Sequence, residues 1–239
     1  MKTLLDEVLE AHGGMDRWRR FSSVRATIVS GGDLFAIKGL PQDPTPREMT
    51  VRLHEEHASV APFGAPDQRT DFTPDRIAIE RTDGTVVAER VHPRKAFDGH
   101  VLGTPWDALD RAYFNGYALW TYLTTPFLLA MPGVDVEEIR PWHEDGEQWR
   151  VLRATFPAAL AGHSTVQDFY FGPDRLLRRN DYRVDIAGGF PAAHYVHDIV
   201  EADGILVPTR RRAYNRDADL RPVPGQVMVA IDLGDIHFT

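Results

Sequence analysis

Residues 104–126 read TPWDALDRAYFNGYALWTYLTTP, a helical pattern in the middle of a sequence that otherwise reads as strands. Thr104 can cap a helix, the proline after it fits the first helical position, and Asp107 adds an acid to the first turn. We expect a helix from Trp106 to about Met131, kinked or ended by one of its prolines. Residues 112–134 carry no charge, but their prolines, threonines and asparagine argue against a membrane span.

On both sides of this helix the apolar residues alternate with a period of two, which is typical of strands. Gly31-Gly32-Asp33 predicts a hairpin between the first two strands. An amphipathic helix over residues 4–9 precedes them and stops at Gly13-Gly14, and Asp16 is expected to cap a further turn. The predicted strands are 24–29, 34–37, 49–53, 58–61, 76–80, 86–90, 134–139, 149–156, 165–171, 176–186, 193–200, 205–214 and 227–238.

The order of these elements predicts a mainly β (α+β) fold, in which an antiparallel sheet packs around the central aromatic helix. From residue 112 onward this helix carries no charge, so that part of it needs an apolar surface on every side, and a curved sheet provides one. No linker, repeat or composition shift divides the chain, so residues 1–239 are expected to form a single domain.

Composition excludes several classes of function. The net charge of -8, with acids spread among 27 Lys and Arg, argues against nucleic acids and anionic membrane surfaces as partners. No cysteine is present, which removes disulfides, thiolate catalysis and Cys-ligated metals. Residues 1–10 carry three acids where a signal peptide would be apolar, so we expect a cytoplasmic protein with no integral membrane segment.

Two hairpins carry a resemblance to a known family. They read FYFGPDRLLRR at residues 169–179 and HDIVEADGILVPTR at residues 197–210, and AHGGMDRW at residues 11–18 adds to them. These segments resemble the LolA/LolB-like outer-membrane lipoprotein-sorting superfamily, of which this chain would be a cytoplasmic-looking member. The resemblance implies a strongly curved antiparallel sheet forming a half-barrel, plugged by helices, with an apolar cavity between them.

Aromatic residues on one face of the central helix are candidates for ligand contacts. Tyr113, Tyr117 and Trp120 stand at positions i, i+4 and i+7, with hydroxyl and indole groups on an apolar stripe. Such residues either pack as a plug, with their polar atoms on backbone carbonyls, or line a pocket and orient a ligand. Both alternatives stay open at this point.

Charged residues alternate around the turn at Gly172. The turn is expected to set Asp168 near Arg179, with Asp181 and Arg183 further along the same face. On an outward face these residues form solvated cross-strand pairs. On an inward face Arg179 would bind a ligand carboxylate, and Asp168 and Asp181 would be candidate catalytic groups.

His12 and His163 lie beside small residues and are the histidine candidates for acid/base chemistry, although His12 at a helix C-terminus is also a favourable partner of the helix dipole. His54 and His57 invite a zinc site, but in a strand residues three apart face opposite sides, and the same argument applies to the pair in residues 194–197. We therefore expect no metal. The sequence holds no phosphate-binding loop, dinucleotide fingerprint or nucleophile elbow, so we expect no cofactor.

Three functions remain. The leading hypothesis is a binding or carrier protein for an apolar or amphiphilic small molecule in a half-barrel cavity. The alternative is a cofactor-independent lyase, isomerase or hydrolase that uses a His or Asp as general acid/base. The third is an interaction protein whose open sheet edge pairs with a partner strand.

Overall fold

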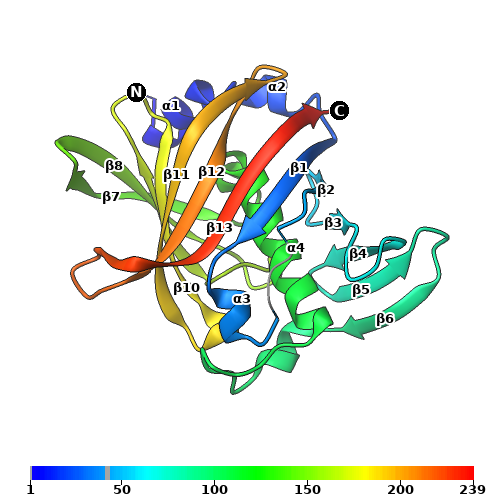
Figure 1. Ribbon diagram of the computed structural model, residues 1–239. Coiled ribbons are helices and arrows are strands. Elements are labelled where there is room, and N and C mark those ends of the chain that lie inside the picture. The colour runs from blue at the N-terminus through cyan, green and yellow to red at the C-terminus, as the bar shows by residue number, and fades with distance from the viewer. Residues whose placement is uncertain (1, 41–43) are drawn as a thin grey trace.

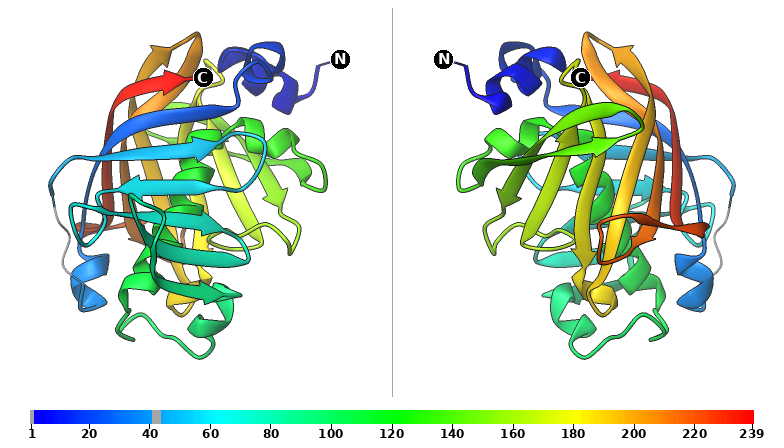
Figure 2. Two further views of the ribbon diagram at one scale, coloured as in Figure 1. Left: turned by 90° about the vertical axis from the view of Figure 1, so that its right-hand side faces the viewer. Right: turned by 90° about the vertical axis from the view of Figure 1, so that its left-hand side faces the viewer.

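The computed structural model describes residues 2–40 and 44–239 and contains one continuous antiparallel sheet of 13 strands. The strand order is β6-β5-β4-β3-β2-β1-β13-β12-β11-β10-β9-β8-β7, so β6 and β7 form the two open edges. Figures 1 and 2 show the sheet curving around helix α4 without closing into a barrel. The predicted fold class, a mainly β half-barrel with a central helix, is confirmed.

The strands before α4 are Ser23–Gly31 (β1), Arg47–Arg52 (β2), Ala58–Ala61 (β3), Gln68–Thr73 (β4), Arg76–Arg81 (β5) and Val86–Val91 (β6). Those after it are Asp135–Glu144 (β7), Glu147–Thr155 (β8), Val166–Phe171 (β9), Leu177–Val184 (β10), Phe190–Ala202 (β11), Ile205–Arg216 (β12) and Pro222–Phe238 (β13). The helices are Leu4–Ala11 (α1), Met15–Trp18 (α2), Leu34–Ile37 (α3) and Ala108–Thr124 (α4), with 3-10 turns at Pro93–Phe97 (η1), Phe127–Ala130 (η2) and Asp185–Ala187 (η3).

The hairpin predicted across Gly31-Gly32-Asp33 is wrong. Residues 34–37 form helix α3, and β1 pairs instead with β2 on one side and β13 on the other. Gly32 takes a φ of +100° and a Cβ there would meet the Met228 carbonyl at 2.6 Å, so the chain turns off the sheet against β13. The apolar run in 34–37 fits a buried helical turn as well as a strand, and the tertiary contacts decide between them.

Both principal helices start with a reciprocal capping pair. In α1 the Asp6 N–H donates to the Thr3 hydroxyl and the Thr3 N–H donates to the Asp6 carboxylate. In α4 Asp107 and Asp110 play these parts, so Asp107 rather than Thr104 is the N-cap. The α2 cap also differs from expectation, because Gly14 rather than Asp16 holds that position.

Helix α4 lies on the concave face and contacts strands β2 to β6. It ends at Thr124 because the residue before a proline disfavours the helical conformation, and Thr125 before Pro126 is extended. The strand β4 beneath it, absent from the predicted set, brings Phe72 against Gly116. A Cβ at Gly116 would stand 2.2 Å from the Phe72 ring, so this close approach requires glycine.

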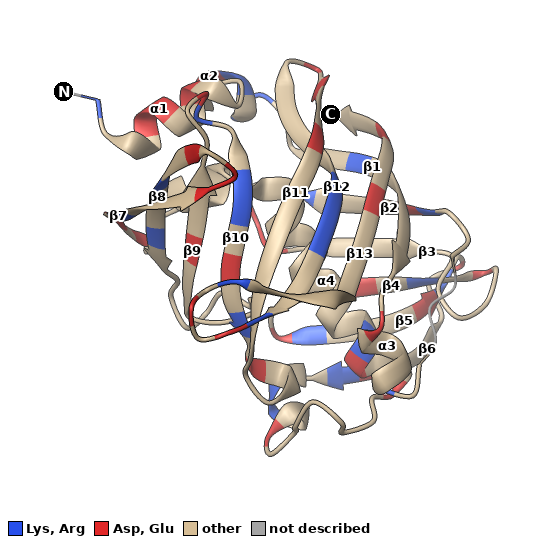
Figure 3. Ribbon diagram, turned by 60° about the vertical axis from the view of Figure 1, so that its left-hand side comes forward, with Lys and Arg blue, Asp and Glu red and all other residues tan. Residues whose placement is uncertain are grey.

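A second, smaller apolar cluster covers the outer face of the sheet at β7 to β11. Trp149, Val151 and Tyr170 form its buried part, with Trp142 and Tyr195 packed against them. Figure 3 shows charged residues along β10 and β12 on this side of the sheet, and the long β12–β13 hairpin folds over it.

Within the described residues, no helix is both long and apolar enough to cross a membrane.

Candidate functional site

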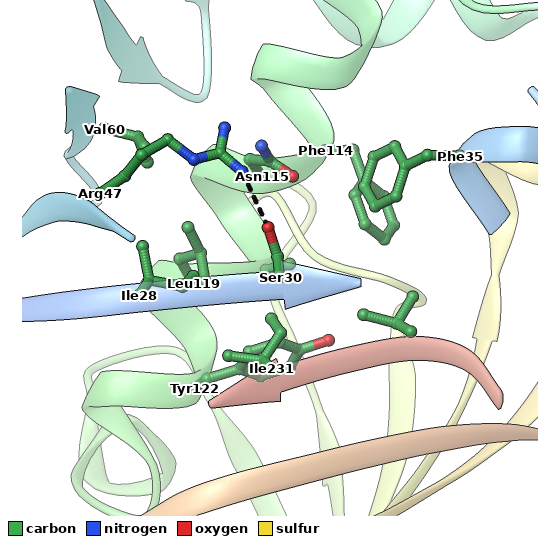
Figure 4. Close-up of a pocket in the computed structure, with 12 residues that line it drawn as sticks. Ile28, Ser30, Phe35, Arg47, Val60, Phe114, Asn115, Leu119, Tyr122 and Ile231 are labelled. Carbon is green, nitrogen blue, oxygen red and sulfur yellow. Dashed lines mark hydrogen bonds between the residues drawn. The ribbon is translucent and has the colours of Figure 1, made fainter. Parts of the chain in front are cut away.

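A narrow cavity lies between α4 and the concave face of the sheet, next to α3 (Figure 4). Eight of the twelve described residues that line it are apolar, among them Ile28, Val60, Phe114, Leu119, Val229 and Ile231. The alternation of side chains along β1 and β13 points Ile28, Val229 and Ile231 inward. The space open to the centre of a water molecule is about 10 Å³, which is room for about one water. The cavity is therefore mostly apolar and too small, as it stands, for a molecule much larger than water.

Four polar residues interrupt the apolar lining of the cavity: Ser30, Arg47, Asn115 and Tyr122. Arg47 is the first residue of β2 and is only 6% exposed. Its Nη2 donates to the Ser30 hydroxyl at 3.0 Å, as Figure 4 shows. Arg47 thus brings a guanidinium group to the wall of an otherwise mostly apolar cavity.

A separate open groove of about 430 Å³ shares one lining residue, Arg47, with the cavity. The loop after β3, Leu40 and the first turns of α4 also line it. Arg111 lines the groove from α4, with its guanidinium carbon 5.7 Å from the Phe63 ring of the groove and 5.0 Å from the Phe35 ring of the cavity. Two arginines thus line the groove.

The three aromatic residues predicted as ligand contacts lie on the side of α4 turned away from this cavity, because their helical spacing separates them from Phe114 and Tyr122. The Trp120 indole N–H donates to the carbonyls of Arg52 and Glu55, at 2.9 Å each. Tyr113 packs against the Phe72 and Phe97 rings. Tyr117 joins the histidine cluster described next. Their contact with a ligand stays a prediction.

His163 is at the centre of a buried histidine–tyrosine cluster. Its Nδ1 lies 3.2 Å from the Tyr117 hydroxyl and its Nε2 lies 3.0 Å from the Tyr122 hydroxyl, while its ring stacks on Tyr182 at 3.9 Å. Burial, with the Arg94 charge as the second cause, lowers the pKa of His163 to about 3. The neutral ring therefore donates to one tyrosine and accepts from the other.

The cluster continues toward β11 and β12. The Tyr182 hydroxyl lies 3.2 Å from Nδ1 of His194, and Arg211 donates from Nη2 to the Tyr122 carbonyl at 2.7 Å. Burial lowers the pKa of Arg211 to about 10, and it lowers the pKa of His194 well below 6.5. Tyr122 links this cluster to the cavity, because its side chain also lines the cavity wall.

The charged residues around Gly172 lie on the outer face, away from α4. The Arg179 guanidinium is fully buried there and uses all five N–H groups: two on the Asp181 carboxylate, two on Glu144 and the Tyr195 hydroxyl, and one on the Leu220 carbonyl. The sequence left open a solvated outer face or a buried inward face. The structure shows neither: these residues face outward, but aromatic side chains and the β12–β13 hairpin cover them.

The register of this hairpin differs from the expected one. A bulge between Leu177 and Arg179 sets Arg179 opposite Tyr170 and sets Asp168 opposite Asp181. Asp168 pairs instead with Arg153, whose Nε and Nη2 donate to its two oxygens at 2.8 and 2.9 Å. Asp168 and Asp181 thus lie across the sheet from the cavity.

His12 is also far from the cavity. Its Nδ1 lies 2.8 Å from the Val8 carbonyl, and its Nε2 accepts a long bond from the Leu177 N–H at 3.4 Å. Burial lowers the pKa of His12 to about 4, so the ring is neutral and ties the end of α1 to β10. A neutral ring is not the cationic dipole partner that the helix position suggested, so this part of the prediction is wrong, and the ring instead satisfies a backbone carbonyl at the end of α1.

The argument against metal binding at His54 and His57 used the wrong local structure. Residues 53–56 form a bend between β2 and β3, not a strand, and both histidines line one open groove. His57 Nε2 lies 2.8 Å from Asp71 Oδ1, and His54 Nε2 lies 2.8 Å from the Phe21 carbonyl. Across the part of the chain that the structure describes, no three His, Asp or Glu side chains gather to hold a metal ion.

Sequence reasoning missed the residues that shape the cavity. Arg47, Met49 and Val51 alternate along β2 and are all buried, so the period of two did signal that Arg47 faces inward. Phe114 and Tyr122 lay within the predicted helix, but the ligand contacts were predicted on the opposite face of that helix. The two faces of α4 are distinguished only by the strands that each face meets in the folded protein.

The sequence matches no protein-family model and no curated protein. Its structure is similar to a DUF1329 family protein from Desulfovibrio piger, with a TM-score of 0.57, 11% identity, and coverage of 98% of this chain and 91% of that one. A LolA superfamily protein from Nitrosomonas europaea matches with a TM-score of 0.54, 13% identity and coverage of 98% and 93%. A putative outer membrane lipoprotein-sorting protein domain from Vibrio parahaemolyticus matches with a TM-score of 0.51, 10% identity, and coverage of 98% of this chain and 93% of that one. The chain has the LolA/LolB-like lipoprotein-sorting fold.

Proposed function

We propose that this protein binds and carries an apolar or amphiphilic small molecule between α4 and the concave face of its sheet. The observation that supports this most directly is the apolar cavity that shares Arg47 with an open groove. Ligand sites are typically concave and mostly apolar, with a few polar groups that fix orientation. Phe114, Ala118 and Tyr122 of α4 are the residues we propose to contact the ligand.

Binding requires the protein to open. The cavity admits about one water molecule, so a ligand of several carbons must separate α4 or α3 from β1 and β13. A ligand achieves this by binding the open form more tightly than the closed form. The groove beside the N-terminal end of α4 is the proposed route of entry.

The similar structures give this proposal limited support. One of them is described as a lipoprotein-sorting protein domain, and lipids attached to proteins are apolar cargo. A shared fold at such low identity does not transfer a function, so the proposal depends on the cavity.

The test uses N-phenyl-1-naphthylamine, an uncharged apolar probe whose fluorescence rises in a dry site. We expect saturable binding by the native protein and loss of binding in Ala118→Leu, because the added side chain occupies the cavity. The matched control is Ala154→Leu, a buried alanine of β8 that does not line the cavity. Each variant is first shown to be folded, since overpacking costs about 1–3 kcal/mol.

Three results would contradict the proposal. One is the absence of saturable probe binding to the native protein, another is unchanged binding in folded Ala118→Leu, and the third is equal loss in both variants. Native mass spectrometry of the purified protein adds an independent readout, with a co-purifying small molecule as the expected result.

A further inference from the structure

We infer that the ligand carries a neutral polar group that both donates and accepts hydrogen bonds, such as an alcohol or a carboxamide, and that Asn115 of α4 binds this group at the cavity wall. This inference rests on the proposed carrier function and adds the chemical class of the ligand's polar group. The apolar part of the ligand lies along the apolar lining between α4 and the sheet.

The side-chain amide of Asn115 is available to a ligand. Asn115 lines the cavity from α4, between Phe114 and Ala118 of the same lining (Figure 4). Its side chain is partly exposed, and no residue in the described part of the chain forms a hydrogen bond with its amide. The amide oxygen can therefore accept from a ligand, and the amino group can donate to one.

The other polar groups of the lining already have partners. The Ser30 hydroxyl accepts from Nη2 of Arg47 at 3.0 Å. The Tyr122 hydroxyl lies 3.0 Å from Nε2 of His163. A ligand that used these atoms would have to replace existing hydrogen bonds, whereas a bond to the Asn115 amide replaces none within the protein.

Other polar side chains of α4 are satisfied within the protein. The hydroxyls of Thr121 and Thr124 donate to the carbonyls one turn earlier, at 2.8 and 2.7 Å, and the Trp120 indole donates to two backbone carbonyls. Asparagine is among the less favourable residues in a helix interior, and Asn115 has no such contact to offset this. A residue that breaks a local rule without a compensating contact is typical of a functional position.

The chemistry of an amide limits its best partner. An amide offers two N–H donors and one carbonyl acceptor, so a ligand group that both donates and accepts can use both ends. A carboxylate only accepts and an ammonium only donates, and each loses hydration when it enters an apolar place. Eight of the twelve described lining residues are apolar, so the cavity replaces little of that hydration.

The test compares polar groups on one decyl chain. 1-Decanol, decanamide, 1-chlorodecane, decanoate and decylammonium are titrated, below their micellar concentrations, against the protein loaded with N-phenyl-1-naphthylamine. We expect 1-decanol and decanamide to displace the probe at concentrations about tenfold lower than decanoate and decylammonium. The stronger of the two neutral compounds identifies the ligand's polar group as an alcohol or as an amide.

Asn115→Leu then tests the proposed contact. Leucine has nearly the shape of asparagine and a better helix propensity, so the variant should fold. It should weaken displacement by 1-decanol and decanamide about tenfold, because their polar group then lacks a partner, and leave 1-chlorodecane unchanged. The matched control is Asn215→Leu, which replaces a partly exposed asparagine of β12 outside the cavity and the groove and should change neither.

The outcomes separate this inference from the proposed function. Tighter displacement by decanoate or decylammonium than by 1-decanol overturns the neutral polar group but leaves a carrier. Unchanged displacement by 1-decanol and decanamide in folded Asn115→Leu overturns the role of Asn115, and so does an equal weakening of 1-chlorodecane. If Asn115→Leu does not fold, the comparison of compounds on the native protein still decides the class of the polar group. If neither the probe nor any decyl compound binds, the proposed carrier function itself is wrong.

Discussion

Acid should destabilise this protein through His163, and the size of the effect follows from its burial. The native ring is neutral with a pKa of about 3, while an unfolded histidine has a pKa of about 6.5. Below pH 6.5 the unfolded chain therefore binds a proton that the native state does not. The stability from this site is present above pH 6.5 and is lost as the pH falls toward 3.

One such proton corresponds to about 1.4 kcal/mol of unfolding free energy per pH unit. Between pH 7 and pH 5 His163 alone should lower the free energy of unfolding by about 2 kcal/mol. Glu56 acts in the opposite direction, because burial raises its pKa to about 8 and the native state keeps a proton that the unfolded chain releases. A comparison of variants removes this and other background contributions.

The variant is His163→Asn, which cannot titrate. Urea unfolding followed by tryptophan fluorescence at half-unit steps from pH 7 to pH 5 gives the free energy of unfolding at each pH. The slope below pH 6 should be about 1.4 kcal/mol per unit shallower than in the native protein, whatever the variant costs at pH 7. His237→Asn, at an exposed position of β13, should keep the native slope. Parallel curves for His163→Asn and the native protein would refute the neutral buried imidazole.

Two further predictions concern packing and the outer face, both measured as urea unfolding free energies. Gly116→Ala should destabilise the protein by about 1–3 kcal/mol, despite the better helix propensity of alanine, because the added Cβ meets the Phe72 ring. The control, Gly103→Ala, has open space around it and should change stability little. Equal effects of the two substitutions would contradict the close approach. Arg179→Met should lower the free energy of unfolding by about 3–5 kcal/mol, because it leaves buried carboxylates without their cation. The control, Arg153→Met, removes a half-exposed ion pair and should cost at most about 1 kcal/mol. A small loss for Arg179→Met would show that this network does not stabilise the outer face.

The β framework was predictable because its signals are local. The period of two and the turn residues located most of the strands, and the charge-free aromatic run located α4. Residues 34–37 were assigned wrongly because four apolar residues fit either a strand or one helical turn, and only the contacts of Leu34 and Phe35 with the core decide. Strand β4 was not predicted, because it carries few apolar residues and therefore shows no clear alternation of apolar and polar positions.

The candidate site was less predictable, because it depends on which face of each element meets which neighbour. The sequence placed polar atoms on both sides of α4, but the fold sends Trp120 to backbone carbonyls and turns Phe114 and Tyr122 to the cavity. His163 lies in a loop, and its partners Tyr117 and Tyr122 are distant in sequence, so no spacing rule relates them.

By itself the sequence determined the fold class, the order of the elements, and the presence of one helix that needs an apolar surface on every side. Those properties follow from periodicity and composition, which act over short stretches of chain. The tertiary structure decided that Arg47 and Arg111 line the same open groove and that Arg179 lies buried on the outer face. The physical reason is that the curvature and register of the 13-stranded sheet bring distant residues together, and these depend on packing across the whole molecule.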